Sequence, residues 1–143
     1  MNRKLFDYIA ASPSPYHAVA HSAEKLRTAG FLPLSEGEDW ALTPGQGYYV
    51  TRNGSSLIAF RTRKDFSGFL MTASHCDSPT FKIKENAELT GSGCRRLAVE
   101  KYGGMLMSTW MDRPLGIAGR VLLRKGSGIE SRLLDLGGEC AVI

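Results

Sequence analysis

The sequence predicts an α/β protein in which two helices come first and strands follow. Before residue 31, apolar side chains recur at the three- and four-residue spacing of a helix face. After residue 46 the pattern changes to short β-rich runs, two of which flank the dipeptide Asn53-Gly54. Further strand-like runs follow beyond residue 96 without another helical pattern. The rear portion is therefore expected to be mostly β.

The two predicted helices have different boundary signals. The first spans 4–11 and ends before Pro13, because proline disfavours helical geometry in the residue that precedes it. The second begins after Ser14, which can cap it, has Pro15 in its first turn, and ends at Gly30. Its apolar stripe consists of Tyr16, Val19, Ala20, Ala23 and Leu26.

The strands are predicted from turn residues and from apolar patterning. Residues 31–47 are expected to be mainly loop, because prolines and glycines interrupt them. Asn53-Gly54 predicts a hairpin, since both residues tolerate positive φ. The apolar run 68–73 predicts a buried strand, and alternation at 81–84 predicts a half-exposed one. Four more strands are predicted at 97–102, 105–110, 115–124 and 129–136.

Composition and charge limit the class of protein. With 43% hydrophobic and 22% charged residues over 143 positions, the chain has the composition of a soluble globular protein. Its net charge of +4 comes from short basic groups scattered along the chain, so a nucleic-acid surface is not indicated. The three cysteines lack CxxC spacing, and no apolar run is long enough for a membrane span. A cytoplasmic protein is expected.

His75 and Asp77 are the candidate functional residues. They directly follow the apolar run 68–73, at the point where a buried strand would give way to a polar turn. A ligating histidine usually donates its second ring N–H to a carboxylate or a carbonyl, so His-x-Asp can supply a zinc ligand together with its orienting group. The alternative is a turn histidine that is hydrogen-bonded to a neighbouring aspartate. A catalytic zinc needs at least three protein ligands, so this pair alone is not a site.

Other chemistries have weaker support in the sequence. His17 and His21 lie four residues apart on the second predicted helix, but the HEXXH pattern is absent, and a structural or surface role is favoured. No GxSxG elbow and no phosphate-binding glycine loop occurs. Cys76 adjoins His75, but adjacent residues of an extended strand point to opposite faces, so a cysteine–histidine nucleophile is not expected.

Three stretches resemble one known family. They are "SPSPYHAV" at 12–19, "SHCDSPTFKIK" at 74–84 and "EKYGGMLMSTWMDRPLGIAGRV" at 100–121. In this order they are similar to the N-terminal part of the aspartyl aminopeptidase family of dinuclear zinc exopeptidases. The resemblance covers nearly the whole chain.

The resemblance implies a fold, a cofactor and an activity. The fold would be the N-terminal part of a zinc-exopeptidase α/β catalytic domain at 1–88, followed by the start of an inserted β-rich dimerisation domain at 89–143. The metal ligand would be His75 and the catalytic carboxylate Asp77, at a centre that holds two zinc ions in the family. The substrate would be a peptide with a free N-terminal residue, often acidic. The protein would form a homo-oligomer through the β domain, with neither nucleic acid nor membrane as partner.

The resemblance also implies which residues of the family's active site this chain lacks. It assigns residues 102–121 to the insertion and not to the metal centre. Cys76, Met111 and Pro114 differ from the residues usual in the family. The bridging carboxylate, the glutamate base and the other metal ligands have no match in this chain, so we expect a truncated N-terminal portion that is inactive alone. The alternative is a non-enzymatic β-rich oligomerisation module derived from the family.

Overall fold

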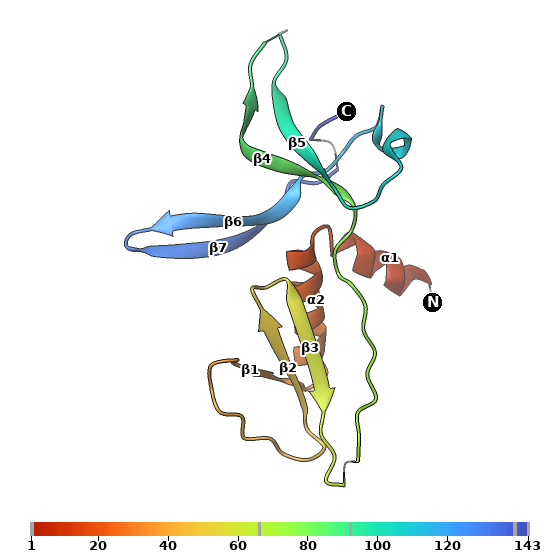
Figure 1. The fold of residues 1–143 in the computed structure, drawn as a ribbon, viewed down its shortest axis with the longest axis vertical. Coiled ribbons are helices and arrows are strands. Elements are labelled where there is room, and N and C mark those ends of the chain that lie inside the picture. The colour runs from red at the N-terminus through yellow and green to blue at the C-terminus, as the bar shows by residue number, and fades with distance from the viewer. Residues whose placement is uncertain (1, 66, 92, 139, 143) are drawn as a thin grey trace.

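The computed structural model describes residues 2–65, 67–91, 93–138 and 140–142. Two helices precede the strands, which confirms the predicted α/β order (Figure 1). The elements are α1 Asn2–Ala10, α2 Pro15–Thr28, β1 Leu32–Leu34, β2 Gly47–Arg52, β3 Ser56–Arg61, β4 Thr80–Leu89, β5 Arg96–Tyr102, the 3₁₀-helix η1 Met107–Trp110, β6 Ala118–Lys125 and β7 Gly128–Asp135. Among the described residues, no helix has the length and apolar character needed to cross a membrane.

Helix α2 has the boundaries that its capping residues predict. The hydroxyl of Ser14 accepts a hydrogen bond from the backbone N–H of His17, and Pro15 occupies the first turn. At the other end Gly30 has φ 82°, a left-handed conformation that ends a helix and that glycine adopts without strain. The local sequence alone therefore defines this helix.

The core of the described chain lies where α2 packs on the first sheet. The sheet has the strand order β1-β2-β3, and Figure 1 shows α2 lying against it. The buried apolar side chains are Ala18, Val19, Tyr48, Tyr49 and Val50, contributed by α2 and β2. This contact fixes the N-terminal part of the structure, because burial of apolar surface is the main stabilising term in folding.

The predicted hairpin is present, with one strand that the sequence did not predict. β2 and β3 pair antiparallel, and Asn53 and Gly54 in the turn have φ 53° and 65°. These positive values are the ones that a tight hairpin turn requires. β1 adds to β2 in parallel. The sequence predicted a loop here, because three residues with a central Pro33 carry no strand signal of their own.

Residues 68–73 do not form the buried strand that was predicted for them. Phe69, Leu70 and Met71 are 81%, 102% and 83% exposed, and no strand is assigned to the described residues between β3 and β4. Figure 1 shows this segment as a long extended trace that leads from β3 to β4. A strand requires a neighbouring backbone for its hydrogen bonds. An apolar run does not supply that neighbour.

The prediction of a strand at 105–110 is also wrong, since this stretch contains η1. The ring of Trp110 packs edge-on against the ring of Phe81 on β4, with centroids 5.4 Å apart. Trp110 therefore packs on β4, while Leu106 in the same stretch is 77% exposed.

β4 and β5 form one antiparallel hairpin. Its open end pairs Thr80 with Tyr102, and its register shifts between Ile83 and Glu88. The boundary predicted between residues 88 and 89 lies at the far end of this hairpin. The division of the chain into parts 1–88 and 89–143 stays a prediction.

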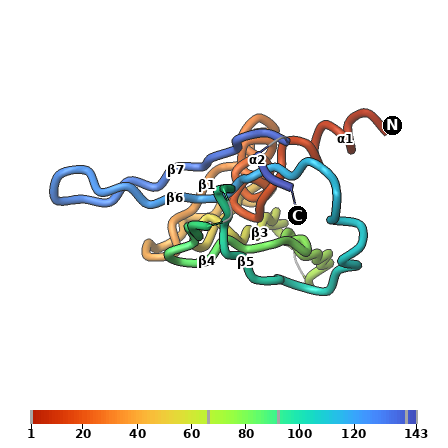
Figure 2. Tube along the Cα trace, turned by 90° about the horizontal axis from the view of Figure 1, so that it is seen from above, coloured from red at the N-terminus to blue at the C-terminus, as the bar shows by residue number. Residues whose placement is uncertain are grey.

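β6 and β7 form a second hairpin, whose base contacts the N-terminal part. Both views show this hairpin extending away from the other elements (Figures 1 and 2). Near its base, the Arg120 guanidinium lies over the ring of Tyr16 on α2, 4.2 Å from the centroid. Arg120 Nη1 also donates a hydrogen bond to the carbonyl oxygen of Asn53 at 2.7 Å. One side chain thus links β6 to both α2 and the β2–β3 turn.

We predict that Arg120→Ala loosens this attachment. Loss of the cation–π contact and of the hydrogen bond is expected to cost about 1–2 kcal/mol, which corresponds to roughly 5- to 30-fold faster amide exchange at the base of β6 and β7. Hydrogen–deuterium exchange measures this directly. Arg124→Ala, an exposed arginine on the same strand, is the matched control. Equal exchange in the two variants would contradict the assigned role of Arg120.

Candidate metal centre

His75 and Asp77 lie in the extended segment just before β4, close to the open end of the β4–β5 hairpin. Gly103, which follows β5, has φ 75°, and a Cβ at this position would lie 3.4 Å from the Cα of Pro79. Tyr102 pairs with Thr80 across the same end. The hairpin thus positions the segment that carries His75 and Asp77, although the segment itself is not part of a strand.

The side chains of His75, Asp77 and Tyr102 form a hydrogen-bonded chain. His75 Nδ1 lies 2.8 Å from the backbone oxygen of Asp77 and 3.0 Å from its Oδ1. The hydroxyl of Tyr102 donates to Asp77 Oδ2 at 2.7 Å. The Asp77 carboxylate therefore has a different partner on each oxygen.

The protonation of His75 follows from these partners. Both groups that face Nδ1 are oxygen acceptors, so Nδ1 must carry the proton. In the neutral ring, Nε2 then carries the lone pair, and an imidazole lone pair is what binds a metal ion. His75 and Asp77 thus have the arrangement of a metal-binding histidine and its orienting carboxylate.

The hydrogen bonds also change the acidity of this cluster. The Tyr102 phenol, donating to the carboxylate, is the largest cause that lowers the pKa of Asp77, and the backbone N–H of Asp77 and the His75 ring add to the effect. In return, the hydrogen bond to Asp77 and the charge of its carboxylate raise the pKa of Tyr102. Both shifts favour an ionised Asp77 beside a neutral phenol.

The cluster is open to solvent. The side chain of His75 is 81% exposed and that of Asp77 is 40% exposed. A pocket at this place is lined by His75, Asp77, Ser78, Pro79, Tyr102 and Gly103. An incoming ligand can therefore reach the imidazole directly.

The residues present do not make a complete zinc site. In the described part of the chain, no group of three or more His, Cys, Asp or Glu side chains is arranged to hold a metal ion. A catalytic zinc requires three protein ligands and an open position. The described residues offer one imidazole with its carboxylate, which fits a single ligand position.

The other two histidines have structural contacts. His17 Nδ1 lies 2.8 Å from Oγ of Ser14, at the start of α2. The His21 ring packs against Tyr8 of α1 with centroids 5.4 Å apart. These contacts favour the structural role that the sequence analysis preferred for both.

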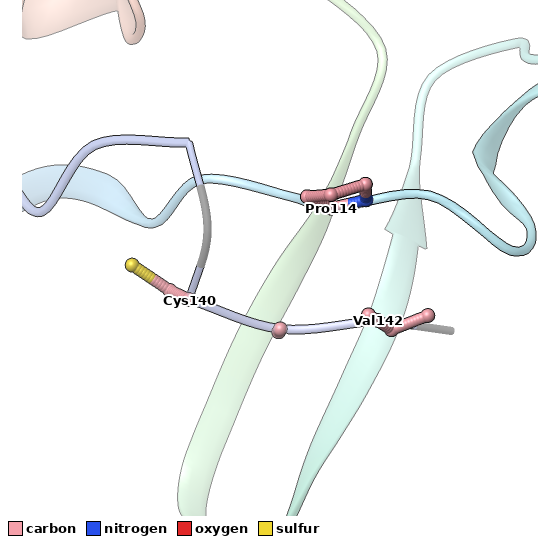
Figure 3. A pocket seen from close by; sticks show the side chains of 4 residues that line it. Pro114, Cys140 and Val142 are labelled. Atoms are coloured by element: carbon pink, nitrogen blue, oxygen red, sulfur yellow. The ribbon is translucent and has the colours of Figure 1, made fainter.

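A second pocket, shown in Figure 3, has no comparable chemistry. It lies where the C-terminal residues pass Pro114, and it is lined by Pro114, Cys140, Ala141 and Val142. The thiol of Cys140 is the one polar side-chain group in this lining, and it donates to the backbone oxygen of Leu136.

Tyr102 is the residue of the cluster that the sequence analysis missed. The resemblance had assigned residues 102–121 away from the metal centre, and the structure places the Tyr102 hydroxyl on Asp77. The available signal was Gly103, because a glycine next to a tyrosine at a strand end allows a close approach of two backbones.

Comparisons with known proteins give a consistent result. The family model described as Aminopeptidase I zinc metalloprotease (M18) matches residues 8–138. The Probable M18 family aminopeptidase 2 of Pseudomonas putida GB-1 is 43% identical over 146 residues, which cover all of this chain and 34% of the relative. The protein of the same name in Pseudomonas aeruginosa PAO1 is 44% identical over an equal share. The chain thus spans about a third of the length of these relatives.

Solved structures match the same portion. Chaetomium thermophilum mApe1 superposes with a TM-score of 0.88 and 30% identity, over 95% of this chain and 32% of that chain. The dodecamer of S. cerevisiae mApe1 gives 0.82 and 35%, over 94% and 33%. The fold matches the N-terminal part of these aminopeptidase structures.

We predict that the Asp77 carboxyl titrates below its ordinary pKa of 3.8 and that Tyr102→Phe raises this pKa. Folding lowers the pKa of the Asp77 carboxyl, so its ionised form stabilises the folded state. This stabilisation is present above pH 3.8 and is lost as the pH falls through the lowered pKa. Carbon NMR of the Asp77 carboxyl across pH measures both variants. Tyr8→Phe, which also removes a hydroxyl hydrogen bond, should leave the Asp77 pKa unchanged. An unchanged pKa in Tyr102→Phe would contradict the assigned cause.

Proposed function

The chain belongs to the M18 family of aminopeptidases, which are zinc metalloproteases, and on this premise we propose that it supplies one metal ligand, His75, to a zinc-dependent aminopeptidase. Asp77 is the catalytic carboxylate that orients this ligand. The observation that supports the proposal is the pair of oxygen acceptors on His75 Nδ1, which leaves the Nε2 lone pair available.

The proposed reaction is removal of the N-terminal residue of a peptide. In a complete centre, zinc supplies polarisation of the scissile carbonyl and activation of water. The contribution of this chain is narrower: Asp77 accepts the Nδ1 proton of His75 and keeps its ring in the tautomer that a metal requires. Because the described residues hold no three-ligand group, we propose that the chain is inactive by itself.

The proposed substrate is a peptide with an acidic N-terminal residue, as the family resemblance implies. A guanidinium could recognise such a carboxylate. In the structure, however, Arg120 holds the Asn53 carbonyl and the Tyr16 ring, and Arg113 Nη1 donates to the backbone oxygen of Thr109. These contacts favour structural roles for both arginines, so we do not assign the acidic preference to either of them.

We further propose that the protein assembles into a homo-oligomer through the part 89–143. A solved yeast relative is a dodecamer, and the β6–β7 hairpin exposes large apolar side chains of the kind that interfaces bury. The three free, exposed cysteines fit a reducing compartment, so the cytoplasm is the proposed location.

A second candidate function is a non-enzymatic oligomerisation module. The same exposed apolar hairpin supports it, together with the lack of a three-ligand group among the described residues. Metal binding separates the two functions, since only the enzyme needs the lone pair of His75.

The proposed function predicts the behaviour of a chimaera. In it, this chain replaces the matching third of the Pseudomonas aeruginosa relative. The chimaera should bind zinc and release N-terminal acidic residues faster than apolar ones. His75→Ala should weaken zinc binding by about 100-fold or more and abolish cleavage, because loss of a ligand exceeds the cost of losing an orienting group. Zinc titration against a chelator and release of the N-terminal residue are the measurements.

The controls for this experiment are His21→Ala in the chimaera and the 143-residue chain alone. The ring of His21 packs against Tyr8 of α1 and is not part of the His75–Asp77–Tyr102 cluster. Loss of His21 should therefore leave zinc affinity unchanged. The chain alone should show no hydrolysis. Full zinc affinity in the His75→Ala chimaera would favour the oligomerisation module, and metal-dependent hydrolysis by the chain alone would refute its proposed inactivity.

A further inference from the structure

We propose that Tyr102 is a positioning residue for His75: its hydroxyl holds the Asp77 carboxylate, and the carboxylate holds the imidazole ring with Nε2 free for a metal. The inference rests on the proposed function of His75 as a ligand. It adds a residue from β5 to a centre that the sequence analysis built from the segment before β4 alone.

The first step of the argument is the geometry of the carboxylate. Oδ2 accepts from the Tyr102 hydroxyl at 2.7 Å, and Oδ1 lies 3.0 Å from His75 Nδ1. With a partner on each oxygen, the carboxylate cannot rotate without breaking a charge-assisted hydrogen bond, which is the stronger kind. The orientation of Asp77 is therefore fixed from the side opposite to His75.

The second step is that the pair needs such support. His75 and Asp77 lie in a segment without strand pairing, and their side chains are 81% and 40% exposed. Asp77 is half-exposed on a segment without strand pairing, so the hydrogen bonds of its carboxylate favour one rotamer over the others. Without the phenol, only the contacts to the His75 ring and to its own backbone N–H would hold the Asp77 carboxylate.

The third step is that Tyr102 itself is held. It is the last residue of β5 and pairs with Thr80, the first residue of β4. Gly103 then lies next to Pro79 with φ 75°, a left-handed conformation that glycine adopts without strain. The open end of the hairpin thus places the phenol next to the residues that precede β4, and the backbone register sets the reach to Asp77.

These steps give the hairpin a second role beside strand pairing. A change in the register of β4 and β5 would move the phenol, and the change would reach His75 through one carboxylate. The part of the chain assigned to the insertion is thereby coupled to the candidate metal ligand.

The tautomer of His75 tests the inference without any metal. Long-range proton–nitrogen NMR on the 143-residue chain, at a pH where imidazole is neutral, should show the Nδ1–H form in the wild type. Tyr102→Phe should shift part of the population towards the Nε2–H form, because the phenol no longer holds the carboxylate on Nδ1 while the backbone oxygen of Asp77 still accepts from it. Tyr8→Phe, which removes the hydroxyl contact to Ser22, should leave the tautomer unchanged.

Two additions make the test decisive. Incorporation of 4-aminophenylalanine at position 102 restores an N–H donor at the same place and should restore the Nδ1–H form. Amide exchange of the paired residues Phe81 and Lys101 reports whether the hairpin is intact. A tautomer that Tyr102→Phe does not change, or a change that the amino variant does not reverse, or one that accompanies loss of hairpin protection, would overturn the inference.

The chimaera separates this inference from the proposed function. There Tyr102→Phe should weaken zinc binding by about tenfold, at the lower end of the effect of outer partners. If His75→Ala leaves zinc affinity unchanged, the proposed function fails. If His75→Ala abolishes binding while Tyr102→Phe changes neither zinc affinity nor the tautomer, the function stands and the role of Tyr102 is refuted.

Discussion

The packing of α2 on β2 is the interaction on which the rest of the structure depends. Helix α2 contacts the first sheet, and the buried apolar side chains of the described chain are Ala18 and Val19 on the helix and Tyr48, Tyr49 and Val50 on β2. The β2–β3 turn is held in place by this sheet. Through Arg120, which contacts both α2 and that turn, the β6–β7 hairpin is attached to the same core.

This core is small for a chain of 143 residues. Large apolar side chains remain exposed on α1, on the extended segment before β4 and on both hairpins. Exposed apolar surface of this extent is characteristic of regions that contact other polypeptide. It agrees with the finding that the chain spans about a third of its relatives, whose remaining length has no counterpart here.

The candidate metal centre shows how an exposed site can be ordered without a deep pocket. The His75 ring is 81% exposed, and its Nδ1 is held by the backbone oxygen and by Oδ1 of Asp77, whose carboxylate is held in turn by Tyr102. That phenol is fixed by strand pairing and by the close approach of Gly103 to Pro79. The rigidity of the site therefore comes from a neighbouring hairpin and not from the segment that carries the ligand.

The sequence by itself determined the features whose causes lie within a few residues. Ser14 and Gly30 set the ends of α2, Asn53-Gly54 set the hairpin turn, and the two-residue spacing of His75 and Asp77 brought their side chains together. Capping, turn conformation and short-range hydrogen bonding are local, so they can be read from neighbouring residues.

Only the tertiary structure decided the features that need a distant partner. The run 68–73 has the composition of a buried strand, yet it forms no strand, and Trp110 packs on Phe81 where a strand was expected. Tyr102 reaches Asp77 across 25 positions of sequence, through a register that no local pattern specifies. Strand pairing and burial depend on which backbone and which surface arrive from elsewhere in the chain, and this is why they could not be predicted from the sequence.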